Sequence, residues 1–222
     1  MIKIQRFICN YLQESSYVAW DEEGCVLVDP GFQDSGEFES LYSFLDGKKL
    51  RPDGILLTHG HFDHILGVKA LVARYGVPVY LNPADAPVLA IAASYGFALH
   101  APETDASFSY LPALDGDILR FKDLEFKVIA TPGHTPGCVC YYDEADGILF
   151  TGDTLFAGAI GRTDLQYGDY DSEIRSIMEK IIFLPGETEI LPGHGPSSNI
   201  ARERMENPFL EPFNEPEETE EL

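Results

Sequence analysis

The chain has 222 residues, of which 37 are Asp or Glu and 15 are Lys or Arg, so its formal net charge is −22. Hydrophobic residues make up 45% of the sequence, which is ordinary for a globular protein, and the length suits one domain with a small appendage. The acidic balance excludes a dominant basic surface for nucleic acid or an anionic membrane, and no run of about 18 apolar residues predicts a transmembrane helix.

The N-terminal segment and the cysteines indicate the compartment. Met1–Arg6 lacks an apolar signal core and is typical of a first strand. Cys9, Cys25, Cys138 and Cys140 contain no CxxC pair, which favours buried thiols in a reducing compartment over a disulfide framework. We therefore expect a soluble, cytoplasmic protein.

The first half of the chain alternates strand and helix signals, and the Asp29-Pro30-Gly31 turn breaks the first sheet. A polar segment, Thr58–His64, follows a short apolar strand and precedes a helical pattern, so it lies in the loop of a β-loop-α-β unit. The strands predicted here are Ile2–Cys9, Ser16–Trp20, Cys25–Asp29, Gly54–Leu57 and Pro78–Leu81. The helices are Glu37–Leu45, Ile65–Tyr75 and Ala84–Tyr95.

The second half repeats this organisation after an irregular stretch, Gly96–Ala113. Strands are predicted at Ile118–Phe121, Glu125–Ala130, Cys138–Tyr142, Ile148–Thr151 and Glu189–Leu191, and helices at Asp171–Ile182 and Ser198–Met205. Two successive halves of this kind predict helices covering two sheets, a layered α/β protein. We expect the domain to occupy residues 1–210 and an acidic, flexible tail to occupy residues 211–222.

Five of the six histidines lie in loops beside glycine or a carboxylate, whereas His100 lies in a featureless stretch and is interpreted as structural. The polar segments are THGHFDH at 58–64, TPGHTPG at 131–137, TGDT at 151–154 and PGHG at 192–195. Each follows a predicted strand, so all four can converge at one sheet edge, where open α/β proteins tend to place their sites.

The spacing of these residues predicts two metal sites. An extended turn points His59 and His61 the same way, and the carboxylate and imidazole that follow can serve a second ion. The first site would use His59, His61, His134 and Asp153, and the second would use Asp63, His64, His194 and the same Asp153. A set of nitrogen and oxygen ligands without thiolates suits two divalent ions, for which we favour Zn(II) over Fe or Mn.

Together, the segment Thr58–His64 and the residues His134, Asp153 and His194 resemble the full ligand set of the metallo-β-lactamase-fold hydrolases. FTGDTLFAGAIGRTD and LPGHGP, which begin at Phe150 and Leu191, are similar to the type II glyoxalase-like (hydroxyacylglutathione hydrolase) branch, especially its short single-domain members. The resemblance implies a four-layer αβ/βα sandwich with a dinuclear site at one edge. Longer members carry a C-terminal helical domain that helps to bind glutathione, and we expect this chain to lack it.

The resemblance also implies a metal-dependent hydrolase of a small acyl substrate, and it favours a thioester such as S-lactoylglutathione. A metal-bridging hydroxide would be the nucleophile, with Asp153 bridging the ions and Asp63 orienting that nucleophile. Arg162 and Tyr167 are candidate substrate contacts, although Arg162 fits a salt bridge within its own loop equally well. Asp29 is a candidate hydrogen-bond partner for a ligand histidine.

Several alternatives stay open. A mononuclear-iron persulfide dioxygenase shares the GRTD segment, but the PGHGP context of His194 favours the hydrolase. A lactonase or a phosphodiesterase fits the same ligand set, and the acidity of the chain disfavours a nuclease. A true β-lactamase is disfavoured because that group typically lacks an aspartate at the position of Asp153. The expected partner is a small molecule, with no nucleic acid and no membrane, and no pattern indicates an oligomeric state.

Overall fold

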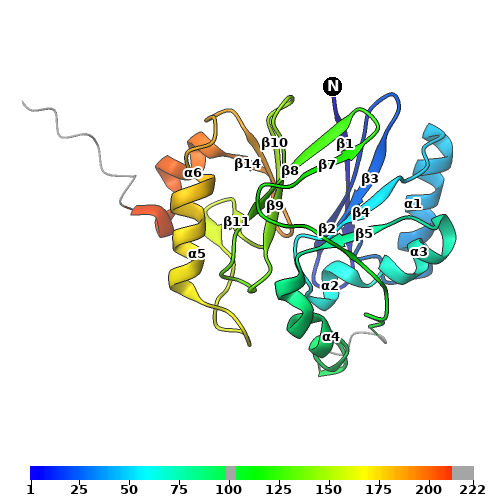
Figure 1. Cartoon of the computed structure of the whole chain (residues 1–222), viewed down its shortest axis with the longest axis horizontal. Coiled ribbons are helices and arrows are strands. Elements are labelled where there is room, and N and C mark those ends of the chain that lie inside the picture. Colours follow the sequence, from blue (N-terminus) through cyan, green and yellow to red (C-terminus); the bar gives the residue numbers. More distant parts are fainter. Residues whose placement is uncertain (99–103, 212–222) are drawn as a thin grey trace, which may run out of the picture.

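Two six-stranded sheets lie at the centre of the computed structural model, which describes residues 1–98 and 104–211 (Figure 1). The strands of the first sheet follow chain order, antiparallel from β1 to β3 and parallel from β3 to β6. They are β1 (Lys3–Cys9), β2 (Glu14–Trp20), β3 (Cys25–Val28), β4 (Gly54–Leu56), β5 (Val79–Leu81) and β6 (Leu111–Pro112).

The helices of the first half cover the outer face of this sheet. They are α1 (Ser35–Lys48), α2 (Phe62–Ile65), α3 (Val68–Tyr75), the 3-10 turn η1 (Pro83–Asp85) and α4 (Ala86–Ala98). Their buried side chains, such as Leu41 of α1 and Leu71 of α3, pack against strand residues such as Leu27 and Ile55. This burial forms the first of three apolar cores.

The second sheet has the strand order β14-β13-β10-β9-β8-β7. Its strands are β7 (Ile118–Phe121), β8 (Leu124–Ala130), β9 (Val139–Asp143), β10 (Ile148–Gly152), β13 (Glu189–Pro192) and β14 (Ser198–Asn199). A small hairpin joins β11 (Leu155–Phe156) to β12 (Ala159–Ile160). The helices are α5 (Tyr170–Ser176) with its π-helical continuation η2 (Ile177–Ile181), α6 (Ile200–Glu206) and the 3-10 turn η3 (Pro208–Leu210).

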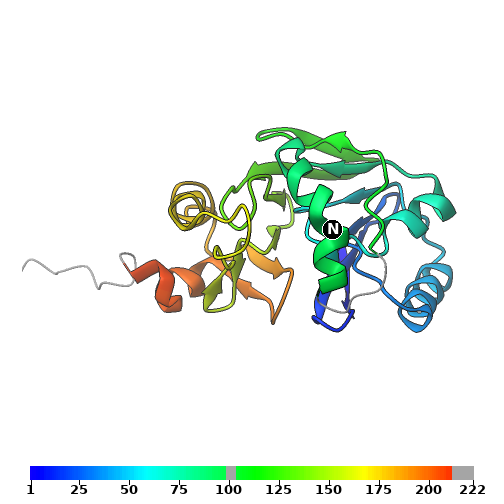
Figure 2. The ribbon, with the colours of Figure 1, turned by 90° about the horizontal axis from the view of Figure 1, so that it is seen from below.

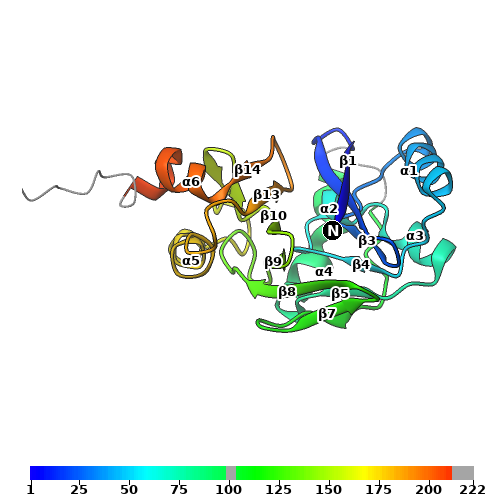
Figure 3. The same cartoon turned by 90° about the horizontal axis from the view of Figure 1, so that it is seen from above.

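The two sheets pack face to face. Val26 and Leu56 of the first sheet share a core with Phe126, Tyr141 and Phe150 of the second. Helices α1 and α3 lie on one side of the sheets and α5 and α6 on the other, as Figures 1, 2 and 3 show. The four-layer αβ/βα sandwich expected from the resemblance is therefore confirmed.

The single helix predicted over Ile65–Tyr75 is wrong, because the structure has two helices there. The first begins earlier, at Phe62, and a break at Gly67 separates it from α3. The backbone N–H of Gly67 donates to the carbonyl of Pro30 at 2.8 Å, and a Cβ at this position would lie 2.8 Å from that oxygen. His64 consequently lies inside the short helix rather than in the loop that precedes a long one.

Other differences lie at element ends. Helix α1 exceeds the predicted Glu37–Leu45, because Asp34 caps its N-terminus and Lys49 ends it in a left-handed conformation. Strand β6 lies within the stretch predicted to be irregular, and the helix predicted from Ser198 begins only at Ile200. Within residues 1–98 and 104–211, no helix is long and apolar enough to cross a membrane. His100 and residues 212–222 of the predicted tail lie outside the described residues.

Candidate metal centre

The four predicted polar segments meet at one edge of the molecule, because each follows the end of a strand that points there. The strands are β4, β8, β10 and β13. The structure brings all seven predicted ligands together at this edge. They are His59, His61, Asp63, His64, His134, Asp153 and His194.

Three histidines form the first group. Nδ1 of His61 lies 3.1 Å from Nε2 of His59 and 2.8 Å from Nε2 of His134. One nitrogen from each ring lies within 4.8 Å of the others, which suits a shared metal ion. Nδ1 of His134 donates to the carbonyl of Arg162 at 2.7 Å, so its Nε2 is the atom left for a metal.

A carboxylate and two histidines form the second group. Oδ2 of Asp63 lies 3.3 Å from Nε2 of His194 and 3.7 Å from Nε2 of His64. These three ligand atoms also lie within 4.8 Å of one another. Asp63 and His64 are buried, whereas the side chain of His194 is 28% exposed, so the second group faces solvent at its His194 side.

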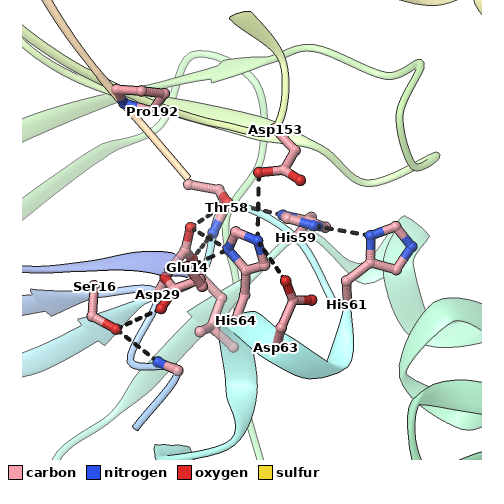
Figure 4. Close-up of polar contacts among 12 residues, drawn as sticks. Glu14, Ser16, Asp29, Thr58, His59, His61, Asp63, His64, Asp153 and Pro192 are labelled. Atoms are coloured by element: carbon pink, nitrogen blue, oxygen red, sulfur yellow. Dashed lines mark hydrogen bonds and ion pairs between the residues drawn. The ribbon is translucent and has the colours of Figure 1, made fainter. Parts of the chain in front are cut away.

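Asp153 contacts histidines of both groups, and Figure 4 shows its carboxylate directed at His64. Its Oδ1 is 3.4 Å from Nε2 of His64, and its Oδ2 is 3.5 Å from Nε2 of His134 and 3.7 Å from Nε2 of His194. One carboxylate therefore reaches histidines of both groups, which is the geometry expected of a bridging ligand.

The charges of the site suit cation binding. Burial, with the neighbouring histidines, lowers the pKa of His61 to about 3 and places the pKa of His59 well below its usual range. Both rings are therefore neutral at pH 7, the form that binds metals. Burial acts to raise the pKa values of Asp63 and Asp153, but the charges and hydrogen bonds of the neighbouring histidines, chiefly His64 and His194, together outweigh it and lower both, so these carboxylates are ionised.

Contacts from the first sheet hold the loop that carries His194. The hydroxyl of Tyr17 donates to the carbonyl of Pro192 at 2.6 Å, and the backbone N–H of Ser15 donates to that of Gly193 at 2.7 Å. A Cβ at Gly193 would collide with Oδ1 of Asp153 and lie 2.6 Å from Cε1 of His64, so the loop approaches the ligands closely only because this residue is glycine.

Asp29 lies directly behind the second group, with its backbone in the left-handed region at φ 45°. Its carboxylate accepts hydrogen bonds from the backbone N–H and the hydroxyl of Thr58, at 2.7 and 2.6 Å, and lies 3.1 Å from Nδ1 of His64 (Figure 4). Glu14 is fully buried beside them, with Oε1 3.9 Å from the same ring nitrogen. Sequence reasoning missed Glu14, because nothing in a strand residue's local pattern marks it as a partner of a distant histidine.

The two candidate substrate contacts lie further out. The guanidinium of Arg162 pairs with Asp164 at 2.8 Å through two nitrogens, and its side chain is 63% exposed. Arg162 therefore forms the salt bridge within its own loop that we gave as the alternative to a substrate contact. The backbone carbonyl of Arg162, rather than its guanidinium, contacts His134. Tyr167 is exposed, with its backbone at φ 75°.

Two further buried carboxylates contact the ligand loops, and sequence reasoning missed both. Oε2 of Glu173, in α5, accepts a hydrogen bond from the backbone N–H of His134 at 2.7 Å. Asp85 accepts hydrogen bonds from Gly60 and Gly137. A sequence signal was available, because each acid shares a helix face with apolar residues: Glu173 precedes Ile177 and Ile181 at four-residue spacing, and Asp85 precedes Leu89 and Ala92.

The residues present fit two divalent cations. Among the described residues, Nε2 of His64 and Oδ1 of Asp153 are buried without a hydrogen-bond partner, although both lie among the ligand atoms. Buried polar atoms without partners are costly, and coordination to a cation would satisfy them. Nitrogen and oxygen donors of this kind bind Zn(II), Fe(II) or Mn(II), so the site implies divalent metals without selecting one of them.

Comparisons with known proteins agree with this geometry. The family model of the metallo-β-lactamase superfamily matches residues 10–194. The probable metallo-hydrolase YqgX of Bacillus subtilis is 36% identical over 96% of this chain and 100% of its own length. Hydroxyacylglutathione hydrolase GloC of Haemophilus influenzae is 34% identical over 89% of this chain and 93% of its own length.

Solved structures show the same fold. The BLEG-1 B3 metallo-β-lactamase superposes with a TM-score of 0.86 at 36% identity, covering 94% of this chain and 99% of that one. TTHA1623 in a di-iron-bound form gives 0.83 at 37% identity, covering 93% and 100%. ETHE1 from Myxococcus xanthus gives 0.76 at 25% identity, covering 97% and 92%. The matched family model, these likenesses and the converging ligand loops confirm the resemblance: the chain belongs to the metallo-β-lactamase superfamily of metal-dependent hydrolases.

Proposed function

We propose that the chain is a dinuclear metal-dependent hydrolase whose substrate is a small thioester. The observation that carries the proposal is the pair of three-residue ligand groups, His59/His61/His134 and Asp63/His64/His194, with Asp153 within 3.4 to 3.7 Å of histidines from both. Divalent cations held there would lower the pKa of a bound water and polarise the substrate carbonyl.

The residues of the chain supply orientation and a proton acceptor. Asp63 is ionised and lies at the more exposed side of the site beside His194, where it can orient the attacking water and accept its proton. The carbonyl of Arg162 fixes which nitrogen of His134 faces the site, and Asp29 does the same for His64. Arg162 and Tyr167 stay predictions as substrate contacts.

The likeness to GloC supports the choice of a thioester, because that relative is named for hydrolysis of hydroxyacylglutathione and aligns over most of both chains. S-lactoylglutathione is therefore the first substrate to test. We propose Zn(II) as the metal, since these donors bind it well, and the di-iron form of TTHA1623 makes iron the principal alternative.

The test is metal analysis of protein purified without chelators, paired with hydrolysis of S-lactoylglutathione. We expect about two divalent ions per chain and turnover that Asp153→Ala abolishes. Two ions without thioester hydrolysis would refute the substrate and leave the metal centre standing. One iron per chain without hydrolysis would refute the dinuclear hydrolase and favour the persulfide dioxygenase alternative.

Hydrolysis of a β-lactam is the second candidate function. The likeness to BLEG-1, at 36% identity over nearly the whole of both chains, favours it. The presence of Asp153 argues against it, since true β-lactamases of this fold typically lack that aspartate. A chromogenic cephalosporin assayed beside S-lactoylglutathione, on the same metal-loaded preparation, separates the two, because the proposed thioesterase should favour the thioester in kcat/KM.

A further inference from the structure

A buried carboxylate outside the predicted ligand set joins two of the four ligand loops. Asp85, the last residue of η1, has no exposed surface and lies where the first sheet's helices approach the metal centre. Its Oδ2 accepts hydrogen bonds from the backbone N–H of Gly60 at 2.6 Å and from the hydroxyl of Thr135 at 2.9 Å. Its Oδ1 accepts one from the backbone N–H of Gly137 at 2.6 Å.

The donors belong to two separate loops that both carry ligands of the first group. Gly60 lies between His59 and His61 on the loop after β4, and Thr135 follows His134 on the loop after β8. These strands belong to different sheets, so no shared ladder sets the distance between the loops. A bond from the N–H of Val139 to the carbonyl of Thr58 joins the strand ends, whereas Asp85 joins the turns themselves.

The fit around the carboxylate is close. A Cβ at Gly137 would lie 2.6 Å from the backbone nitrogen of Asp85 and 2.7 Å from its Oδ1, so this loop reaches the carboxylate only with glycine there. An ionised carboxylate only accepts hydrogen bonds, and each of the three donors meets an oxygen. A neutral amide of the same size would turn one NH₂ group toward a donor.

We propose that Asp85 is a positioning residue that sets the distance between His61 and His134, and thereby the metal affinity of the first group. The inference rests on the proposed dinuclear site, but it assigns a new residue to it. The hydrogen bonds of Asp85 go to Gly60, Thr135 and Gly137 and not to a ligand atom, so it acts through these three residues.

The test is a stepwise Zn²⁺ titration of metal-free protein against a chelating dye, which resolves the two affinities. In Asp85→Asn we expect the first group's affinity to fall about 10- to 100-fold, the range typical of lost partners of metal ligands. We expect the affinity of the second group to stay within about threefold, because Asp63 and His64 lie in helix α2 and His194 follows β13, and no residue of these segments bonds to Asp85. Unchanged affinities at both groups would overturn the proposal.

Thr135 provides a gentler pair of variants that decides the matter if Asp85→Asn does not fold. Thr135→Val removes the hydroxyl donor at nearly constant volume, and Thr135→Ser keeps it. The first group's affinity should fall in Thr135→Val and return to the wild-type value in Thr135→Ser. Equal affinities in the two variants would refute the role of the carboxylate in positioning.

Asp143 is the matched control for losing a buried carboxylate. It is 5% exposed, lies at the opposite end of β9 from the ligand loops and accepts a hydrogen bond from the N–H of Asp146. Asp143→Asn should leave both affinities unchanged.

Two other outcomes would count against the proposal. An equal fall in affinity at both groups in Asp85→Asn, with a matching loss of unfolding free energy, would assign Asp85 a purely structural role. Wild-type protein that binds no Zn²⁺ would instead refute the metal centre itself.

Discussion

Oδ2 of Asp29 lies 3.1 Å from Nδ1 of His64, and the same carboxylate accepts two hydrogen bonds from Thr58. Asp29 follows the third strand, Thr58 follows the fourth strand, and His64 lies in helix α2. One buried carboxylate therefore connects the first sheet to a ligand ring and leaves Nε2 of that ring directed at Asp63 and Asp153.

Replacing Asp29 by Asn should weaken metal binding at the second group by about 10- to 100-fold, because the amide cannot accept from Thr58 and from His64 as the carboxylate does. Stepwise Zn²⁺ titration measures this affinity. Asp34→Asn is the matched control, since Asp34 caps helix α1 and Asn caps a helix N-terminus equally well. Wild-type affinity in Asp29→Asn would contradict the prediction.

Asp63→Asn should lower kcat for thioester hydrolysis by about 10²- to 10⁴-fold, because a neutral amide cannot accept the proton of the attacking water. Michaelis–Menten kinetics on metal-loaded variant, with metal content measured in the same sample, check this. The metal content separates loss of proton transfer from loss of an ion. A variant that retains both ions and wild-type kcat would show that Asp63 takes no proton.

Removing metal with a chelator should lower the free energy of unfolding, because the cations bind only the folded ligand set. Free metal at 100 times its Kd contributes about 2.7 kcal/mol for each site. Urea unfolding with and without added Zn²⁺ measures the difference. In His194→Ala, the increase in unfolding free energy caused by Zn²⁺ should be smaller, because the second site no longer contributes. An increase as large as in the wild type would show that the stabilising ion binds elsewhere.

Stability should fall in alkaline solution because of buried thiols. Burial raises the pKa of Cys140 and of Cys25 from 9.0 to about 12, and both thiols are free. Between pH 9 and about pH 12, each thiol loses its proton in the unfolded chain but keeps it in the folded chain. The free energy of unfolding therefore falls as pH rises, by about 1.4 kcal/mol per pH unit for each thiol.

Urea unfolding over the range from about pH 8 to 10.5 measures this slope, which should be shallower in Cys140→Ala than in the wild type. The comparison of slopes is insensitive to the lower stability that the cavity itself causes at every pH. Parallel slopes for the two proteins would show that the Cys140 thiol does not titrate differently in the folded and unfolded states.

Much of the fold could be predicted because its signals are local. The apolar runs that form β4, β8, β10 and β13, and the glycine-rich polar loops after them, are visible along the chain. The break at Gly67 was not, because it depends on a bond to Pro30, a residue 37 positions away that becomes a neighbour only when the sheet forms.

The sequence by itself determined which residue types gather at the strand ends, because the spacing of histidine, aspartate and glycine along these loops already indicates a metal site. Only the tertiary structure decided how they meet: that Asp153 lies between the two groups, that Arg162 offers its carbonyl rather than its guanidinium, and that Asp85 and Glu173 are buried partners rather than surface acids. The reason is physical: helical spacing can indicate that an acidic side chain faces the core, but the N–H that it accepts from belongs to a distant segment, and only packing brings that donor to it.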